Sequence, residues 1–345
     1  MTDAILDITD RRILDLIQSQ FPLVERPYAA IAERVATNES DVIERLARLA
    51  QAGIVREISA VFDSVRLGYR STLAAMAVEP ARLEEVAAIV SAHPGVSHNY
   101  ERMHQFSLWF TLTVAGDCSI KDEVERLARK AQVSDFLVLP ALRRFKIGVD
   151  FDLGTRPTVS DEDESEPMSE TDMGPQSQAE PVALSPRDKD AARALQTNLP
   201  LEPRPFERLA ATVSMSEGEL LDAAKRFLAA GVMRRYCAVL RHRRVGYGVN
   251  AMVCWAIPAE RIEEAGQRAA RERAVSHCYE RPSFPPRWPY NLMTMIHGRS
   301  ENEVREVVQR LLADLKPDAH AVLFSHREFK KQRVRYFEPD FPAPH

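Results

Sequence analysis

The chain has 345 residues, of which 45% are hydrophobic and 28% are charged, and its net charge is −4. It is long enough to form two or more domains with their own cores. The sequence contains no run of about 18 apolar residues, which excludes a conventional membrane helix. The first residues, MTDAILDITDRR, lack a secretion signal pattern, so we expect a cytoplasmic protein.

Four cysteines are scattered without a CxxC pair, at positions 118, 237, 254 and 278. This spacing predicts reduced thiols and argues against a zinc site. Residues 155–182 hold eight acidic residues and one basic residue and almost no large apolar side chain. Such a segment cannot bury enough surface to fold, so we predict a flexible acidic linker over 154–182.

The sequences on the two sides of this linker resemble each other. Residues 21–28, FPLVERPY, match residues 199–206, LPLEPRPF, and the motif Ser-His-x-Tyr-Glu-Arg occurs at 97–102 and again at 276–281. Two copies of this length indicate a tandem domain duplication and not a solenoid.

Each copy begins with a predicted set of three short helices. In the first copy, Thr9 is a plausible N-cap for the first helix, Pro27 opens the second, and Asn38 or Ser40 caps the third, which ends at Gly53. A β-like run, IVREISAVFD, follows. This order predicts winged helix-turn-helix domains over 1–62 and 183–240.

The rest of each copy alternates between strands and amphipathic helices. In the first copy, the periodicity predicts strands at 69–78, 96–103, 106–114 and 135–146, and helices at 81–93 and 119–132. The order β-α-β-β-α-β is that of a ferredoxin-like sandwich, predicted here over 63–153 and 241–338. The expected fold class is therefore α+β.

A winged helix-turn-helix followed by a ferredoxin-like domain resembles the Lrp/AsnC family of transcription regulators. A DNA-recognition helix usually presents Lys or Arg near its N-terminal end. Here that end carries Glu39, Asp41 and Glu44, and the second copy carries similar acids. These acids can instead favour the helix dipole. The sequence therefore argues against DNA binding, and a transcription regulator is the alternative interpretation.

The repeated motif concentrates groups that transfer protons and bind carboxylates. Strand alternation predicts that His98, Tyr100 and Arg102 share one face, to which His104 returns. His transfers protons near neutral pH, and Arg binds carboxylates. Together with nearby aromatic residues, this set suits a planar apolar ligand with acidic edges. The alternative is a turn-capping His and a core Tyr.

The longer stretches LDITDRRILDLIQSQFPLVERPYAAIA, REISAVFDSVRLGY, PGVSHNYERMHQFSLWFTL and VSHCYERP…YNLMTM resemble the siroheme decarboxylases, which are Lrp-like. The order of the halves is similar to a fused form of the two-subunit enzyme on the pathway to haem d1. The resemblance implies loss of CO2 from the C12 and C18 acetates of siroheme, giving 12,18-didecarboxysiroheme. It also implies that active-site histidines act without a required cofactor. A tetrapyrrole-binding protein without activity is a further alternative.

On this basis the predicted catalytic residues are His98, His104 and His277, with His98 and His104 as an acid/base pair. The predicted substrate-binding residues are Tyr100, Arg102, Trp109, Arg143, Arg144, Lys146, Tyr279, Arg281, Arg327 and Lys330. The alternative for the positive residues of the last strands is that they are ordinary exposed charges on a strand surface and do not bind substrate.

The second copy has no counterpart of His104, because PSFPPRWPYN (282–291) stands in its place. His297 and His326 are weak candidates for a replacement, so a second complete site is in doubt. An axial bond to the substrate iron is an alternative role for His98, His104 or His277. We expect the two halves to form a pseudo-dimer within one chain, and further self-association is open.

Overall fold

The computed structural model describes residues 6–19, 21–147, 180–240, 249–339 and 341. Most of the predicted linker lies outside the described residues, as do 241–248. The chain divides into two compact units. The first unit comprises residues 1–68, 180–242 and 335–339. The second comprises residues 69–179, 243–334 and 340–345.

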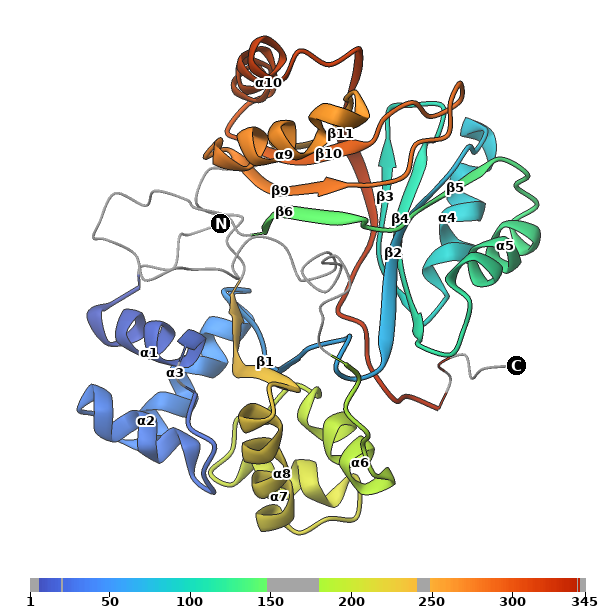
Figure 1. The fold of residues 1–345 in the computed structure, drawn as a ribbon. Coiled ribbons are helices and arrows are strands. Elements are labelled where there is room, and N and C mark those ends of the chain that lie inside the picture. The colour runs from blue at the N-terminus through green and yellow to red at the C-terminus, as the bar shows by residue number, and fades with distance from the viewer. Residues whose placement is uncertain (1–5, 20, 148–179, 241–248, 340, 342–345) are drawn as a thin grey trace. The chain divides into compact units, whose positions relative to one another are not determined.

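The first unit contains both helix-turn-helix copies. Its first copy consists of α1 (Ile8–Ser19), α2 (Pro27–Val35), α3 (Glu39–Gln51) and β1 (Val55–Phe62). Its second copy consists of α6 (Pro186–Leu195), α7 (Pro205–Ala211), α8 (Glu217–Ala229) and β7 (Met233–Leu240). Strands β1 and β7 pair antiparallel, with Ile58 opposite Ala238, so the two copies share one small sheet (Figure 1).

The helix starts follow local capping chemistry. Pro27 opens α2 as predicted, and the Asn38 side chain accepts a hydrogen bond from the backbone N–H of Asp41 at 2.9 Å. The prediction of Thr9 as the first N-cap is wrong. The Asp7 carboxylate accepts from the backbone N–H of Asp10 at 2.7 Å, so α1 begins two residues earlier.

The second unit contains two β-α-β-β-α-β copies, as predicted. The first copy consists of β2 (Tyr69–Met76), α4 (Leu83–Ser91), β3 (Val96–Arg102), β4 (Leu108–Ala115), α5 (Ile120–Lys130), β5 (Phe136–Leu139) and β6 (Arg143–Ile147). The second copy consists of β8 (Val249–Ala256), α9 (Ile262–Arg271), β9 (Val275–Glu280), β10 (Leu292–Gly298), α10 (Glu301–Leu315) and β11 (Ala319–Lys331). Single 3-10 turns at Pro80–Arg82 and Ala259–Arg261 precede α4 and α9.

The two copies exchange their last strands. The first part of β11 pairs with β8 of its own copy, and its second part pairs with β3 of the first copy. In the same way, β5 pairs with β2 and β6 pairs with β9. The single strand predicted over 135–146 is therefore two strands. Pro140 lies between them, where its missing N–H cannot serve a sheet.

Two kinds of core hold this unit together. Helices α4 and α5 cover one face of β2–β4, and α9 and α10 cover the matching face of β8 and β10 (Figure 1). We call the opposite face of these strands the inner face. It buries an apolar cluster from both copies, the inner cluster, which includes Leu73, Phe106, Trp109, Met252, Trp288 and Leu323.

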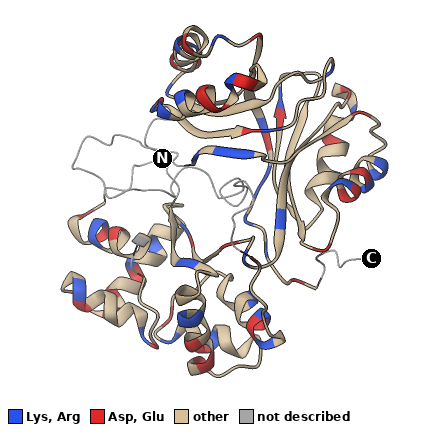
Figure 2. Cartoon of the chain, in the orientation of Figure 1, with Lys and Arg blue, Asp and Glu red and all other residues tan. Residues whose placement is uncertain are grey.

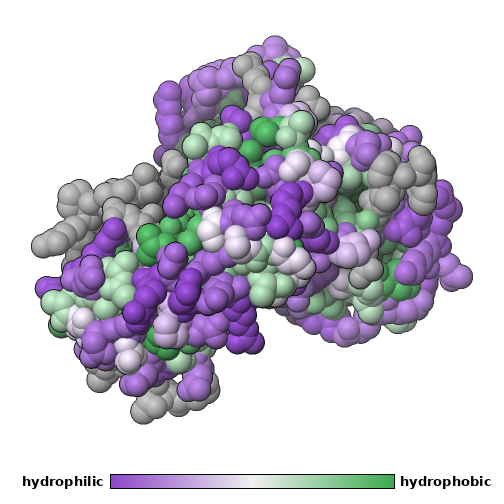
Figure 3. Space-filling view, turned by 90° about the horizontal axis from the view of Figure 1, so that it is seen from below, coloured by the Kyte–Doolittle hydropathy of each residue, from purple (hydrophilic) through white to green (hydrophobic). Residues whose placement is uncertain are grey.

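Exposed large hydrophobic residues are few among the described residues, and Met103 is the most exposed at 76%. In Figure 3, hydrophilic residues occupy much of the visible face, and hydrophobic residues show in separate areas between them. Among the residues that the structure describes, no helix combines the length and apolar character needed to cross a membrane.

Candidate active site

A β-bulge in each copy positions the repeated motif. On β3 the pairing with β4 changes between Val96 and His98, so Ser97 is an extra residue in the strand. On β9 the pairing with β10 changes in the same way, and Ser276 is the extra residue. A bulge turns the following side chains to the opposite face of the sheet.

The bulge on β3 has this effect. Val96 packs in the helix-side core, and Asn99 donates hydrogen bonds to Ala87 O (3.1 Å) and Ser91 Oγ (3.0 Å) on α4. The alternate residues His98, Tyr100 and Arg102 therefore lie on the inner face.

On this face the motif forms a stack that we call a His–Tyr–Arg ladder. In the first ladder, the rings of His98 and Tyr100 stack at 6.0 Å, and the Arg102 guanidinium lies 5.7 Å from the Tyr100 ring centre. His98 is 3% exposed and Arg102 is 6% exposed. Contact with an aromatic face helps to hold the buried guanidinium.

The second ladder repeats this geometry. The rings of His277 and Tyr279 stack at 6.2 Å, and the Arg281 guanidinium lies 5.0 Å from the Tyr279 ring centre. Arg281 is only 1% exposed. Two similar sets of histidine, phenol and guanidinium therefore lie on the inner face, one from each copy.

Each ladder is anchored on the other copy. Arg102 Nη1 donates to the carbonyl of Leu323 on β11 at 2.9 Å, and Arg281 Nη1 donates to the carbonyl of Leu139 on β5. A buried charge needs such hydrogen bonds to offset its lost hydration. Burial also raises the pKa of the Cys254 thiol to about 12, although both guanidinium charges oppose this shift. Cys254 therefore stays a neutral thiol in the inner cluster.

The ladder histidines differ in their second contacts. His98 Nδ1 lies 3.0 Å from Ser97 Oγ, and His277 Nδ1 lies 2.7 Å from Ser276 Oγ. Ser276 Oγ also lies 2.7 Å from His297 Nε2. The strand pairings place Thr113 in the first copy where His297 stands in the second.

His104 lies in the turn after β3, apart from His98. Its ring stacks on Phe106 and meets Trp288 edge-on at 5.4 Å. Since a strand rises about 3.3 Å per residue, the Cα atoms of His98 and Arg102 are about 13 Å apart, and His104 follows beyond. Burial lowers the pKa of His104, which favours a neutral ring at pH 7. The structure does not bring the predicted acid/base pair together.

The positive residues of the last strands lie mainly on the helix side. Arg143 pairs with Glu263 and Glu280, and Arg327 pairs with Glu84 (2.5 Å) and Glu101 (2.9 Å). Figure 2 shows the basic residues of β6 beside the acids of the adjacent elements.

The lysines of these strands bind backbone carbonyls on the same side. Lys146 Nζ donates to Glu272 O at 2.9 Å, and Lys330 Nζ donates to Ser91 O at 2.7 Å and His93 O at 3.1 Å. Burial lowers the pKa of Lys330. These four basic residues hold helices to strands and do not gather at the ladders.

Two other cations lie opposite the ladders in the strand pairings. Arg144 pairs with Tyr279, and Lys331 pairs with His98. Lys331 was absent from the sequence-based set, because only the exchange of β11 brings it beside β3. Trp109 is 1% exposed, and its Nε1 donates to Phe106 O at 2.7 Å, so it is a member of the inner cluster. The described residues contain no group of three or more His, Cys, Asp or Glu that could hold a metal ion.

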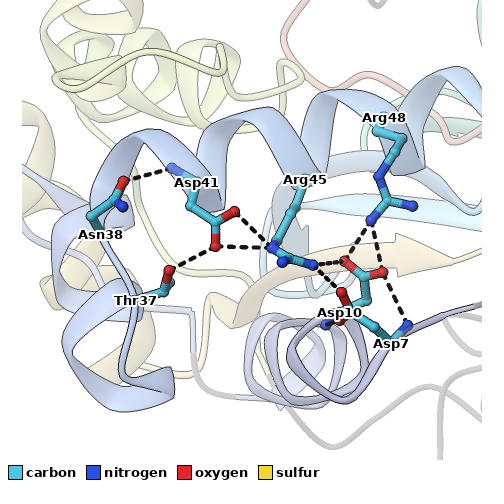
Figure 4. Close-up of polar contacts among 7 residues, drawn as sticks. All are labelled: Asp7, Asp10, Thr37, Asn38, Asp41, Arg45 and Arg48. Atoms are coloured by element: carbon cyan, nitrogen blue, oxygen red, sulfur yellow. Dashed lines mark hydrogen bonds and ion pairs between the residues drawn. The ribbon is translucent and has the colours of Figure 1, made fainter.

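The third helix of the first copy, a candidate DNA surface, has its arginines in ion pairs. Arg45 binds Asp7 (2.6 Å), Asp10 (2.9 Å) and Asp41 (2.9 Å), and Arg48 binds Asp10 at 2.7 Å (Figure 4). These contacts raise the pKa of Arg45. Both guanidinium groups therefore fix α3 to α1 and are engaged by carboxylates.

One acid at the start of α8, Glu219, has a capping role. The Glu219 carboxylate accepts from the Ser216 backbone N–H and hydroxyl, both at 2.8 Å, and these bonds lower the pKa of Glu219 to about 2. Acids at this position therefore stabilise the helix start.

Comparison with known proteins agrees with this architecture. Residues 66–146 and 244–330 match the family model of the AsnC-like ligand binding domain. Residues 10–56 and 188–234 match that of the siroheme decarboxylase NirDL-like HTH domain. The chain is thus a tandem protein of AsnC-like and helix-turn-helix domains.

Relatives that match nearly the whole chain identify its family more specifically. A siroheme decarboxylase of Hydrogenobacter thermophilus is 40% identical over 331 residues, which cover 96% of this chain and 95% of the relative. The siroheme decarboxylase NirDL subunit of Paracoccus denitrificans is 36% identical and covers 95% of this chain and 97% of its own.

A solved structure of the siroheme decarboxylase NirDL in co-complex with an iron-uroporphyrin III analogue superimposes with a TM-score of 0.73. It is 35% identical and covers 96% of both chains. The chain belongs to the siroheme decarboxylase family.

Proposed function

We propose that this chain removes CO2 from the acetate side chains at C12 and C18 of siroheme and gives 12,18-didecarboxysiroheme. Its relatives are named siroheme decarboxylases, and one of them has been solved in co-complex with an iron-uroporphyrin III analogue. The observation that carries the proposal is the pair of His–Tyr–Arg ladders on the inner face. Each ladder combines a proton-transfer group with a flat aromatic ring and a fixed positive charge.

The reaction sets the chemical requirement. In each decarboxylation, the bond between the methylene carbon and the carboxylate breaks, CO2 leaves, and the electron pair stays on the methylene carbon. That carbon then takes one proton and becomes a methyl group. Each step consumes one proton. The carboxyl carbon is formally oxidised and the methylene carbon formally reduced, so the two changes cancel and the proposal calls for no redox partner.

We assign proton donation to His98 and His277. Each has Nδ1 held by the serine of its bulge, which leaves Nε2 as the atom for transfer to substrate. His104, with its lowered pKa, suits proton acceptance and acts apart from His98.

The walls of this proposed site are formed by the other ladder residues, Tyr100 and Arg102 in the first copy and Tyr279 and Arg281 in the second. Arg144 and Lys331, which lie opposite ladder residues, are the proposed contacts for substrate carboxylates. We leave Arg143, Lys146, Arg327 and Lys330 out, since carboxylates and carbonyls of the chain engage them.

A DNA-binding regulator is disfavoured, because the basic residues of α3 are bound by Asp7, Asp10 and Asp41. A DNA-binding protein would also show strongly salt-dependent binding. Cytoplasmic location and haem d1 synthesis belong to the same proposal.

Anaerobic incubation of the purified chain with siroheme, followed by chromatography and mass spectrometry, tests the proposal. We expect the successive loss of two CO2 units. Siroheme that binds and returns with unchanged mass would contradict the proposal and indicate a carrier.

A further inference from the structure

The hydroxyl of Ser276 bridges two imidazole rings. Its Oγ lies 2.7 Å from His277 Nδ1 and 2.7 Å from His297 Nε2, and the three residues are 1%, 9% and 8% exposed. A hydroxyl has one proton to donate. When it donates to one ring nitrogen, it can only accept at the other, so the protonation of the two rings is coupled.

This arrangement follows from the fold. Ser276 is the bulge residue of β9, and His297 lies near the end of β10, the strand that pairs with β9. Ser276 Oγ also lies 3.4 Å from the carbonyl of Met295. Met295 belongs to the inner cluster, pairs with His277 and lies two residues before His297 on β10, so both histidines lie on the inner face.

The first copy has the same bulge without the second imidazole. Its equivalent of His297 is Thr113, whose hydroxyl lies 2.7 Å from Ser71 Oγ. A threonine hydroxyl does not hold an extra proton near neutral pH, whereas an imidazole does. The two ladders therefore differ in how a proton can reach the ladder histidine.

The described groups near the bridge are a phenol, two guanidinium groups and an amide. Tyr279 stacks on His277, Arg281 follows on the same strand, and Arg144 lies opposite Tyr279 on β6. Strand β8 places the neutral Asn250 opposite His297.

We infer that His297 is a positioning residue that supplies a proton to His277 through Ser276, an inference that rests on the proposed function. When His277 Nε2 gives its proton to the methylene carbon, its Nδ1 takes the hydroxyl proton of Ser276. Ser276 in turn takes the Nε2 proton of His297. An imidazolium at His297 thereby becomes neutral, with its remaining proton on Nδ1.

The next proton that reaches His277 Nε2 from water reverses both transfers and recharges His297. Each cycle thus consumes one proton from water and no other reagent. At the equivalent position the first ladder has Thr113 in place of this imidazole, and we expect its histidine to be recharged from water directly.

The test is His297→Thr, which copies the first half at this position, together with Ser276→Ala and the double variant. Each variant is compared with wild type for siroheme turnover under anaerobic conditions. We expect kcat to fall by roughly tenfold to a hundredfold in each single variant, the range of positioned acid–base groups or slightly below it. KM should stay within about twofold, because the relay does not bind the substrate.

The double variant should be no slower than the slower single variant, because both changes interrupt one relay. A further variant, His297→Ala, leaves room for a free imidazole. Added imidazole should restore part of its rate and leave the rate of Ser276→Ala unchanged. Thr113→Val, which changes the equivalent position of the first copy, is the matched control and should keep the wild-type kcat.

Full kcat in His297→Thr would overturn the inference, and so would losses that multiply in the double variant. If a variant fails to fold, the ring ¹⁵N shifts of His277 and His297 in wild type decide instead: coupled titration supports the relay, and independent titration overturns it. A wild-type chain without turnover would overturn the proposed function, whereas an active wild type with unaffected variants would overturn the relay alone.

Discussion

Trp288 packs the second-copy insertion against the first copy. It is 0% exposed and contacts His104, Phe106 and Trp109, with ring centres 5.3–6.0 Å away. Its Nε1 has no hydrogen-bond partner among the described residues. The indole therefore acts through packing alone, and we predict that Trp288→Ala strongly destabilises the second unit.

The magnitude follows from the buried surface. An aromatic side chain buries about 150–250 Å², and at about 25 cal/mol per Å² this corresponds to about 4–6 kcal/mol. Tryptophan-to-alanine changes in cores cost about 3–5 kcal/mol. We expect a loss of about 4 kcal/mol in the free energy of unfolding.

Urea denaturation followed by tryptophan fluorescence measures this loss. Trp109, Trp255 and Trp288 all lie in the second unit, and the chain has three tryptophans, so the signal reports that unit alone. Trp288→Phe is the matched control, with an expected loss below about 1.5 kcal/mol. A loss below about 0.5 kcal/mol in Trp288→Ala, as at exposed sites, would refute the packing argument.

Three further predictions concern the site and the helix side. His98→Ala and His277→Ala should each lower kcat by roughly a hundredfold or more, while the exposed His320→Ala should match wild type; equal rates for all three would exclude the ladders from catalysis. Arg143→Met and Arg327→Met should keep wild-type KM, because both side chains engage carboxylates on the helix side, and a KM raised in either would show that it contacts substrate. Stability should fall as pH drops from about 7 toward 5, since burial lowers the pKa of His93, with Glu123 at 2.6 Å opposing this shift and the nearby Arg126 and Lys330 charges adding to it. The unfolded chain then binds a proton that the folded chain excludes. Melting temperatures of His93→Gln should depend less on pH over this range than those of wild type, and an identical slope would contradict the assignment.

Local sequence patterns were enough to predict the order of elements. Pro27 and Asn38 start helices through interactions within a few residues, and the strand and helix periods of each copy depend on which side chains face a core. The duplicated motif likewise predicted that His98, Tyr100 and Arg102 share a face.

The exchanged strands and the bulges depend on long-range pairing. Nothing local to residues 135–146 shows that the chain leaves β2 after Leu139 and joins β9 at Arg143. That change of partner places Arg143 and Lys146 on the helix side. The matching change of partner along β11 is why Lys331 comes to lie opposite His98. The bulge on β9 and its pairing with β10 are why the Ser276 bridge could not be predicted from spacing alone.

The most direct test of the account compares wild type with the His98→Ala/His277→Ala double variant in one anaerobic siroheme incubation, read by mass spectrometry. The account predicts loss of two CO2 units by wild type, and siroheme that is bound but unchanged in mass with the double variant. Didecarboxylated product from the double variant at the wild-type rate would contradict the claim that the ladder histidines carry out the reaction.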